Sequence, residues 1–265
     1  MSNRLDFWKL RFLKILHIPV GHEIKLAGYR VHFATIKHLT LLFKEIFVKK
    51  NYQCDMPDTP YIIDGGANIG LAVLYFKKHY PEAKVIAFEP NPESFKYLKK
   101  NVESNNLQNV EIHNAALGGQ EGTIMFYTST DMPEADIGAS AVRQHVARHH
   151  QQKGEIRELP IKCYKLSAFV DSTVHLLKLD VEGSEGEIIR ELDDRFGKVQ
   201  NCIMEFHYVT GNTDNSLADI LKVMEKNDHL YFLSPVGRSK RINFKSGYIL
   251  VSRKNDEDDK AAGIR

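Results

Sequence analysis

Residues 61–70 read YIIDGGANIG, and this stretch decides the fold. A run of bulky and branched residues leads directly into Asp64. Three glycines and an asparagine then follow within six positions. A buried strand that enters such a glycine-rich turn is typical of sites where a ligand approaches main-chain atoms closely. The turn therefore predicts a ligand site at the end of a strand, and the rest of the chain has to identify the ligand.

Strand and helix patterns alternate from this stretch onward. We predict strands at 61–64, 84–90, 110–117, 123–129, 175–183, 201–208, 230–235 and 247–253, and helices at 69–80, 92–106, 184–196 and 216–228. Strands separated by helices form parallel βαβ units. The pattern predicts an α/β, Rossmann-like, doubly wound, mostly parallel seven-stranded sheet. The last two strands lack an intervening helix, so they predict a hairpin and one antiparallel strand.

Three segments lie outside this alternation. We predict that residues 1–58 form an N-terminal extension with a helix, a strand pair and a second helix. The main domain then spans 59–254 and carries a polar, irregular insertion at 130–158, which is typical of a lid or a binding loop. The high charge of residues 255–265 predicts that this tail is disordered.

Composition narrows the class of protein. The 265 residues carry a net charge of +2, and no cluster of motifs indicates a nucleic-acid partner. Three scattered cysteines without C-x-x-C spacing argue against a disulfide framework. No apolar run approaches the roughly 20 residues of a membrane span, and the N-terminus is a poor signal peptide. We therefore expect a cytoplasmic protein without a transmembrane segment.

The charge is nevertheless uneven. Residues 1–51 contain ten Lys or Arg and three acidic residues, which gives this segment a net charge of 10 − 3 = +7. Apolar residues alternate with the basic ones between 7 and 15. This pattern is compatible with a helix on a membrane surface, but a dimer or domain-packing face is the better interpretation. A homo-oligomer through the extension is therefore possible.

Acidic and amide side chains at predicted strand ends help to identify the ligand. Parallel strands bind ligands beyond their carboxyl ends, so these side chains should converge on one crevice. The turn lacks the G-x-x-x-x-G-K-[ST] pattern of a P-loop and the complete G-x-G-x-x-G of a dinucleotide turn. The carboxylate of Asp64 would also repel a pyrophosphate on the following helix. It favours a cofactor with an ammonium and a sulfonium group, which indicates S-adenosylmethionine.

A family resemblance agrees with this deduction. The blocks IIDGGANIG, VIAFEPNPESFKYLKKNV, NAALGG, LLKLDVEGSE and IMEFH follow one another between residues 62 and 207. In sequence and order they resemble the FkbM-type class I S-adenosylmethionine-dependent methyltransferases. The resemblance implies that the turn holds the methionine part of the cofactor and that Glu89 binds the ribose hydroxyls. The implied cofactor-binding residues are Asp64, Gly66, Asn68, Gly70, Glu89, Asn91, Asn114 and Ala115.

A second group of polar residues lies on the two later strands. Asp180 and Glu182 follow one strand, and Glu205 and His207 share a face of the next. We predict these four as catalytic residues, with His207 or an acid of raised pKa as the base that removes the acceptor proton. Asp180, Glu205 and His207 could instead bind a divalent metal, because oxygen and imidazole ligands suit Mg or Mn. A metal-free base is the favoured interpretation.

The resulting prediction is a methyltransferase that acts on an oxygen of a small-molecule, glycan or natural-product acceptor. N-methylation of a peptide side-chain amide is the alternative within the same class. Two alternatives come from other classes, namely an NAD-dependent oxidoreductase and a non-catalytic binding module on the same fold. Asp64 and the incomplete dinucleotide turn argue against the first, and the presence of both Asp64 and Glu89 argues against the second.

Overall fold

The computed structural model describes residues 3–129, 139–143, 146, 155–208, 212–235 and 248–255. Most of the polar insertion predicted at 130–158 lies outside the described residues. The same holds for the charged tail from residue 256 onward, so its predicted disorder stays a prediction.

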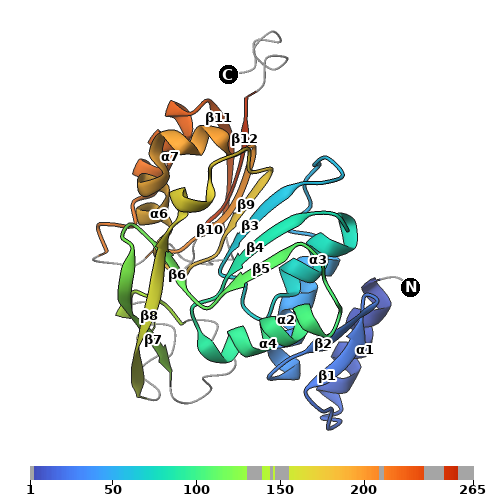
Figure 1. Ribbon diagram of the computed structural model, residues 1–265. Helices are drawn as coiled ribbons and strands as arrows, with labels where there is room; N and C mark the ends of the chain where they lie inside the picture. The colour runs from blue at the N-terminus through green and yellow to red at the C-terminus, as the bar shows by residue number, and fades with distance from the viewer. Residues whose placement is uncertain are drawn as a thin grey trace.

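A seven-stranded sheet forms the centre of the protein, in the spatial order β11–β12–β10–β9–β3–β4–β5 (Figure 1). Its strands are β3 (Tyr61–Gly65), β4 (Lys84–Phe88), β5 (Val110–His113), β9 (Leu176–Leu179), β10 (Asn201–Phe206), β11 (His229–Pro235) and β12 (Tyr248–Lys254). Strands β5, β4, β3, β9 and β10 are parallel to their neighbours, whereas β12 is antiparallel to both β10 and β11. The predicted Rossmann-like fold, with one antiparallel strand, is therefore confirmed.

Helices cover both faces of this sheet. The surrounding helices are α3 (Leu71–His79), α4 (Pro92–Glu103), the 3-10 helix η3 (Leu166–Phe169), α6 (Glu185–Leu192), the 3-10 helix η4 (Asp193–Lys198) and α7 (Leu217–Lys226). Alternate strand residues point to opposite faces, as in any strand. Ile62 thus packs in the core under α3 and α4, and its neighbour Ile63 packs in the core under α6 and α7. This arrangement leaves the carboxyl ends of the parallel strands free to form a site.

A second, three-stranded sheet lies beside the main one. It consists of β6 (Ala116–Gly118), β7 (Gly122–Ser129) and β8 (Ile156–Lys165), in the order β6–β8–β7. The single strand predicted at 110–117 is therefore wrong, because the chain leaves the main sheet after His113 and enters the side sheet at Ala116. The amide of Asn114 donates to the carbonyl oxygen of Glu89 at 2.8 Å, which holds the chain at this change of sheet.

The N-terminal residues form α1 (Asn3–Ile15), the antiparallel pair β1 (Glu23–Leu26) and β2 (Tyr29–His32), helix α2 (Ile36–Phe43) and a π-helical continuation η1 (Lys44–Val48). Their buried side chains join the core on the α3–α4 face. Among the described residues no helix is long and apolar enough to cross a bilayer.

Candidate active site

The glycines of the turn after β3 are required by packing within the chain. Gly66 has a left-handed backbone with φ of 82°, and a Cβ there would lie 1.8 Å from the carbonyl oxygen of Asp180. Gly70 has the same φ, and its Cβ would lie 2.6 Å from a methyl group of Leu98. Any other side chain at position 66 would force the ends of β3 and β9 apart. The sequence analysis attributed these glycines to the approach of a ligand, so the close approach of the chain itself is an added cause.

Asp64 lies beneath the turn, fully buried. Its Oδ1 is 2.9 Å from Nζ of Lys178, which also donates to the carbonyl oxygen of Gly66 at 2.6 Å. Oδ2 of Asp64 has no hydrogen-bond partner among the described residues. Burial lowers the pKa of Lys178, but the charge and hydrogen bond of Asp64, together with Tyr52 and Asp180, outweigh this effect and hold the pKa above its usual range. Asp64 therefore acts on the turn through Lys178.

Glu89 follows β4 and is buried against the same turn. One carboxylate oxygen accepts the backbone N–H of Asn68 at 2.6 Å, and the other accepts that of Asn91 at 2.8 Å. A carboxylate offers about four lone-pair positions, so two remain for further donors. Burial raises the pKa of Glu89 to about 7, although both N–H groups favour the charged form. The carboxylate is thus fixed in place and still able to accept two hydroxyl donors.

Asn91, Asn114 and Ala115, which the family resemblance implied as cofactor-binding residues, divide into two groups. Ala115 is buried and lines the cavity beside Ala116, Leu117 and Phe126, which makes an apolar wall. Asn91 is the N-cap of α4, with its side chain accepting from the N–H of Glu93 at 3.0 Å. Asn114 holds the β4 exit, as described above. The structure therefore places Ala115 at the cavity, whereas the two asparagines shape the loops around it.

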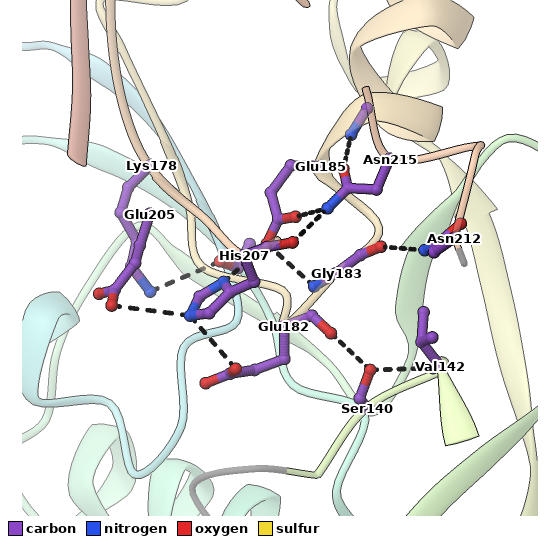
Figure 2. Close-up of polar contacts among 12 residues, drawn as sticks. Ser140, Val142, Lys178, Glu182, Gly183, Glu185, Glu205, His207, Asn212 and Asn215 are labelled. Atoms are coloured by element: carbon purple, nitrogen blue, oxygen red, sulfur yellow. Dashed lines mark hydrogen bonds and ion pairs between the residues drawn. The ribbon is translucent and has the colours of Figure 1, made fainter. Parts of the chain in front are cut away.

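His207 lies directly after β10 and is enclosed by three carboxylates (Figure 2). Its Nε2 is 3.2 Å from Glu182 Oε2 and 3.6 Å from Glu205 Oε1. Its Nδ1 is 3.0 Å from Oε1 of Glu185. The predicted convergence of Glu182, Glu205 and His207 is thus present in the structure, with Glu185 as a further member. The sequence analysis did not select Glu185, which is an acid in the first turn of α6.

A buried network holds Glu185 in position. Its side chain is fully buried and accepts the N–H of Gly183 at 3.1 Å and the amide of Asn215 at 2.8 Å. The same amide of Asn215 donates to the carbonyl oxygen of His207 at 2.7 Å (Figure 2). These contacts fix the imidazole so that Nε2 faces Glu182 and Glu205. No sequence pattern marks Asn215, because it reaches the cluster from the loop before α7.

The carboxylates determine the charge of this cluster. Burial favours neutral imidazole, but Glu182, Glu185 and Glu205 together raise the pKa of His207 well above its usual value. The sequence analysis took a pKa near 6.5 as the starting point for a histidine base. The raised pKa instead favours the imidazolium form, which has no lone pair with which to accept a proton.

Asp180 is the acid best suited to proton transfer. Burial and the charges of Glu205 and Glu182 raise its pKa, whereas Lys178 and His207 lower it, and the net pKa is about 7. General bases work best when their pKa lies near the operating pH. Asp180, Glu205 and His207 each also offer one ligand atom within 4.8 Å of the others, so these three residues could surround a cation.

One cavity joins the two groups of residues. It has a volume of about 580 Å³, which suits a cofactor-sized ligand. From the predicted set it is lined by Gly66, Asn68, Glu89, Ala115, Asp180, Glu182, Glu205 and His207. Asp64, Gly70, Asn91 and Asn114 lie behind this lining.

Further lining residues were absent from the predicted site. The N-terminal segment forms one wall with Leu41, Leu42, Glu45, Ile46, Lys49, Asn51 and Tyr52. Tyr52 lies close to Lys178, whose Nζ is 5.7 Å from the ring centroid. From the insertion, Ser140 donates its hydroxyl proton to the carbonyl oxygen of Glu182, which has a left-handed backbone with φ of 58° (Figure 2). No motif links these segments, because they meet only in the folded chain.

Comparison with known proteins identifies a family of methyltransferases. The model of the methyltransferase FkbM domain matches residues 64–231. Methyltransferase 1 of Beauveria bassiana (strain ARSEF 2860) is 32% identical over 178 residues, which cover 62% of this chain and 72% of the relative. Methyltransferase sdnD of Sordaria araneosa is 31% identical over 189 residues, or 62% of this chain and 73% of the relative. The 31-O-demethyl-FK506 methyltransferase FkbM of Streptomyces tacrolimicus is 23% identical over 209 residues, or 67% and 80%.

Proposed function

Because this chain belongs to the FkbM family of methyltransferases, we propose that it methylates an oxygen of a small-molecule or glycan acceptor. Its methyl donor is S-adenosylmethionine, which carries the transferable methyl group on a sulfonium. One observation carries the proposal: a single cavity is lined by both the glycine turn with Glu89 and the Asp180–His207 cluster. Cofactor and acceptor could therefore meet there without rearrangement of the sheet.

The residues present fit this cofactor. The buried carboxylate of Glu89 retains two acceptor positions, which match the two hydroxyls of a ribose. Gly66 and Asn68 line the cavity beside Glu89, in the position for the methionine part. The apolar wall around Ala115 suits adenine. Carboxylates at Asp180, Glu182 and Glu205 favour a ligand that carries positive charge.

Asp64 has an indirect role in this proposal. It is fully buried and does not line the cavity. In place of the implied direct contact with the cofactor, we assign to Asp64 the support of the glycine turn through Lys178. Lys178 ties together the charge of Asp64 and the carbonyl oxygen of Gly66. In this arrangement Gly70 serves the close packing of α4 against the turn.

The proton of the acceptor is the second task of the site. We assign Asp180 as the base, because its pKa of about 7 lets the carboxylate exist at neutral pH and still bind a proton. The imidazolium of His207 offsets the negative charge of Glu182 and Glu205 and keeps both side chains in place. The remaining contribution is alignment of donor and acceptor.

A metal-assisted version of the same reaction has one observation in its favour. The ligand atoms of Asp180, Glu205 and His207 lie within 4.8 Å of one another, and Glu185 holds the second ring nitrogen of His207, as acidic residues do behind metal-bound histidines. A bound divalent cation would supply charge stabilisation to a deprotonated hydroxyl.

The relatives support an oxygen acceptor. One of them is named for methylation of 31-O-demethyl-FK506. The proposed acceptor of this chain is a hydroxyl compound, and the alternative acceptor is a peptide side-chain amide. The test is incubation with S-adenosylmethionine and a panel of polyketide, sugar and peptide-amide acceptors, with products detected by mass spectrometry. Methylated hydroxyl compounds would support the proposal, whereas exclusive methylation of amides would replace it with the alternative.

The cofactor itself can be tested without an acceptor. Thermal unfolding with S-adenosylhomocysteine or with NAD separates the methyltransferase from the oxidoreductase. Binding to the folded state raises the unfolding temperature. Stabilisation by S-adenosylhomocysteine alone is the expected result, and stabilisation by NAD alone would contradict it.

A further inference from the structure

Helix α1 presents an apolar stripe to solvent. Leu10 on its inner side is fully buried, while the outer side exposes large apolar side chains to between 39% and 62%. This stripe consists of Leu5, Trp8, Phe12, Ile15, Leu16 and Ile18. At 100° per residue, its members within α1 fall within an arc about 80° wide. A continuous exposed apolar surface of this kind marks an interaction site rather than chance exposure.

Basic residues flank the stripe. On the same helical projection, Arg4 and Arg11 lie at one edge and Lys9 lies at the other. Arg11 also lies over the ring of Trp8, with its guanidinium carbon 4.8 Å from the ring centroid. The stripe with its basic edges therefore combines apolar contact with positive charge along a single helix face.

The acids of this segment do not offset that charge at the surface. Asp6 turns inward and accepts the N–H of Ala27 at 2.7 Å. Glu23 pairs with Arg30 at 3.3 Å, and Glu45 pairs with Lys49 at 2.7 Å. Each acid of residues 1–51 thus has a partner away from the stripe, and the segment keeps its net charge of +7.

We propose that α1 docks this protein on an anionic lipid surface, with the apolar stripe inserted among the headgroups. An interfacial helix has these features: an apolar face that contains Trp and Phe, Lys and Arg beside it, and no length requirement for a span. Trp favours this zone because its ring is apolar and its N–H is polar. Anionic headgroups attract the positive charge of the basic edges.

A second copy of the chain is the competing occupant. A two-fold interface brings the same patch of both copies together. The basic residues at the edges of the stripe (Arg4, Lys9 and Arg11) would then face those of the second copy, and like charges would repel. A lipid surface buries the same apolar stripe and attracts the same charges. The charge complementarity therefore favours the lipid surface.

The position of α1 leaves the active site intact on docking. The helix lies at the edge of the molecule, away from the main sheet (Figure 1). Its inner side packs against the segment that lines the cavity, and the Asn3 amide donates to the carbonyl oxygen of Phe47 at 3.1 Å. Docking thus needs no opening of the fold, and this proposal does not depend on the proposed function.

The chain contains its own probe for the test. Trp8 is its single tryptophan, so the intrinsic emission reports on α1 alone. Vesicles of phosphatidylcholine mixed with phosphatidylserine should shift this emission to the blue and carry the protein with them in flotation. Vesicles of pure phosphatidylcholine should do so much more weakly, and added salt should reverse the effect.

Variants separate the two contributions to binding. Phe12→Glu should weaken the vesicle partition coefficient at least about tenfold, because it removes one buried aromatic ring. Arg11→Glu should weaken it at least about fivefold, because a cationic residue near the surface contributes about 1 kcal/mol. Phe232→Glu is the matched control, because Phe232 is a 69% exposed apolar residue on β11 and should leave binding unchanged.

Three results would overturn the proposal. The first is unchanged emission with both kinds of vesicle. The second is a blue shift that grows with protein concentration when no vesicles are present, since this identifies self-association. The third is equal loss of binding in Phe12→Glu and Phe232→Glu.

Discussion

Nζ of Lys178 lies 2.9 Å from Oδ1 of Asp64, and the two residues are register partners on the neighbouring strands β9 and β3. Both side chains are almost fully excluded from solvent, at 4% and 0% exposure. The ion pair sits under the glycine turn and reaches it through the carbonyl oxygen of Gly66. The geometry of the turn therefore depends on a buried pair of which Lys178 lines the cavity and Asp64 lies behind it.

Removal of one partner should destabilise the fold. Asp64→Asn leaves the cation of Lys178 buried beside a neutral amide, so the free energy of unfolding should fall by about 3–5 kcal/mol. Asp64→Asn combined with Lys178→Met should recover much of this loss, because the double variant buries no unpaired charge. Urea denaturation measures all three proteins.

An exposed pair provides the control. Lys96 lies 2.8 Å from Glu93 on the surface of α4, and Lys96→Met should change stability little. If Asp64→Asn is as stable as the wild type, or if the double variant is the least stable of the set, the buried pair does not support the turn.

The central sheet could be predicted from local patterns. The parallel strands β3, β4, β9 and β10 are apolar-rich runs, and each is followed by a helix with apolar residues at helical spacing, so the order of these elements was visible in the sequence. The last strand was also predictable, since the sequence pattern predicts no helix between 230–235 and 247–253. The structure places β12 between β10 and β11 and antiparallel to both.

The side sheet shows where local patterns failed. Residues 110–117 form one apolar-rich run, but the chain changes sheets at Asn114 because its amide bonds the carbonyl oxygen of Glu89, 25 positions away. Residues 156–158 were assigned to the irregular insertion, yet they begin β8, which pairs with β7 along its full length. Both features depend on partners distant in sequence.

The site was predictable to a similar extent. Glu89, Asp180, Glu182, Glu205 and His207 line one cavity, as expected for residues at the ends of parallel strands, whereas Asp64 lies behind this lining. Their charge states were not predictable, since the pKa of His207 depends on Glu185, whose position comes from a tertiary contact. Tyr52 was missed for the same reason, because it reaches the cavity only through the packing of the N-terminal segment.

Glu89 should control cofactor affinity. Glu89→Gln removes a charged acceptor for the ribose hydroxyls, so binding of S-adenosylhomocysteine should weaken by about 1.5–3 kcal/mol. The deprotonated form accepts more hydrogen bonds, and the pKa of Glu89 is raised to about 7. Wild-type affinity should therefore increase as pH rises through about 7, and the Gln variant should lose this step.

Isothermal titration calorimetry over a pH series tests both statements. Glu93→Ala is the control, because Glu93 lies in the first turn of α4, accepts from Nζ of Lys96 and does not line the cavity. Identical affinities for Glu89→Gln and the wild type at high pH would disprove ribose binding by Glu89.

His207 should stabilise the fold in a pH-dependent way. Its pKa is raised in the folded protein by Glu182, Glu185 and Glu205, whereas the unfolded value is about 6.5. The stabilisation is therefore fully present below about pH 6.5 and is lost as pH rises through the folded pKa. His207→Gln should lower the free energy of unfolding by about 3 kcal/mol near pH 6, and by less in alkaline solution.

Denaturation curves of the variant and the wild type across this range provide the measurement. His175 supplies a control, because burial lowers its pKa and its ring accepts from the N–H of Tyr61. The cost of His175→Gln should not decrease with rising pH. A difference between His207→Gln and the wild type that grows with pH would show that His207 is neutral in the folded state.

Asp180 should set the pH dependence of turnover. With cofactor and acceptor saturating, kcat should rise with pH through about 7, because only the carboxylate can accept the proton and burial raises its pKa to that value. Asp180→Asn should lower kcat by about 10²–10⁴-fold and remove the step. Affinity for S-adenosylhomocysteine should change far less than in Glu89→Gln. A variant with wild-type kcat would exclude Asp180 as the base.

A metal-dependent mechanism predicts different results for variants of the same residues. If Asp180, Glu205 and His207 hold a divalent cation, a chelator should abolish turnover, and Mn²⁺ or Mg²⁺ should restore it. Glu205→Gln should then raise the metal concentration needed for half-maximal activity, because one ligand charge is lost. In the metal-free mechanism the chelator has no effect, and Glu205→Gln acts only by releasing His207 from one of its three acidic neighbours.

Chelator-insensitive turnover in a fully active Asp180→Asn enzyme would exclude both mechanisms. The site would then act by holding an already nucleophilic acceptor in line with the methyl group.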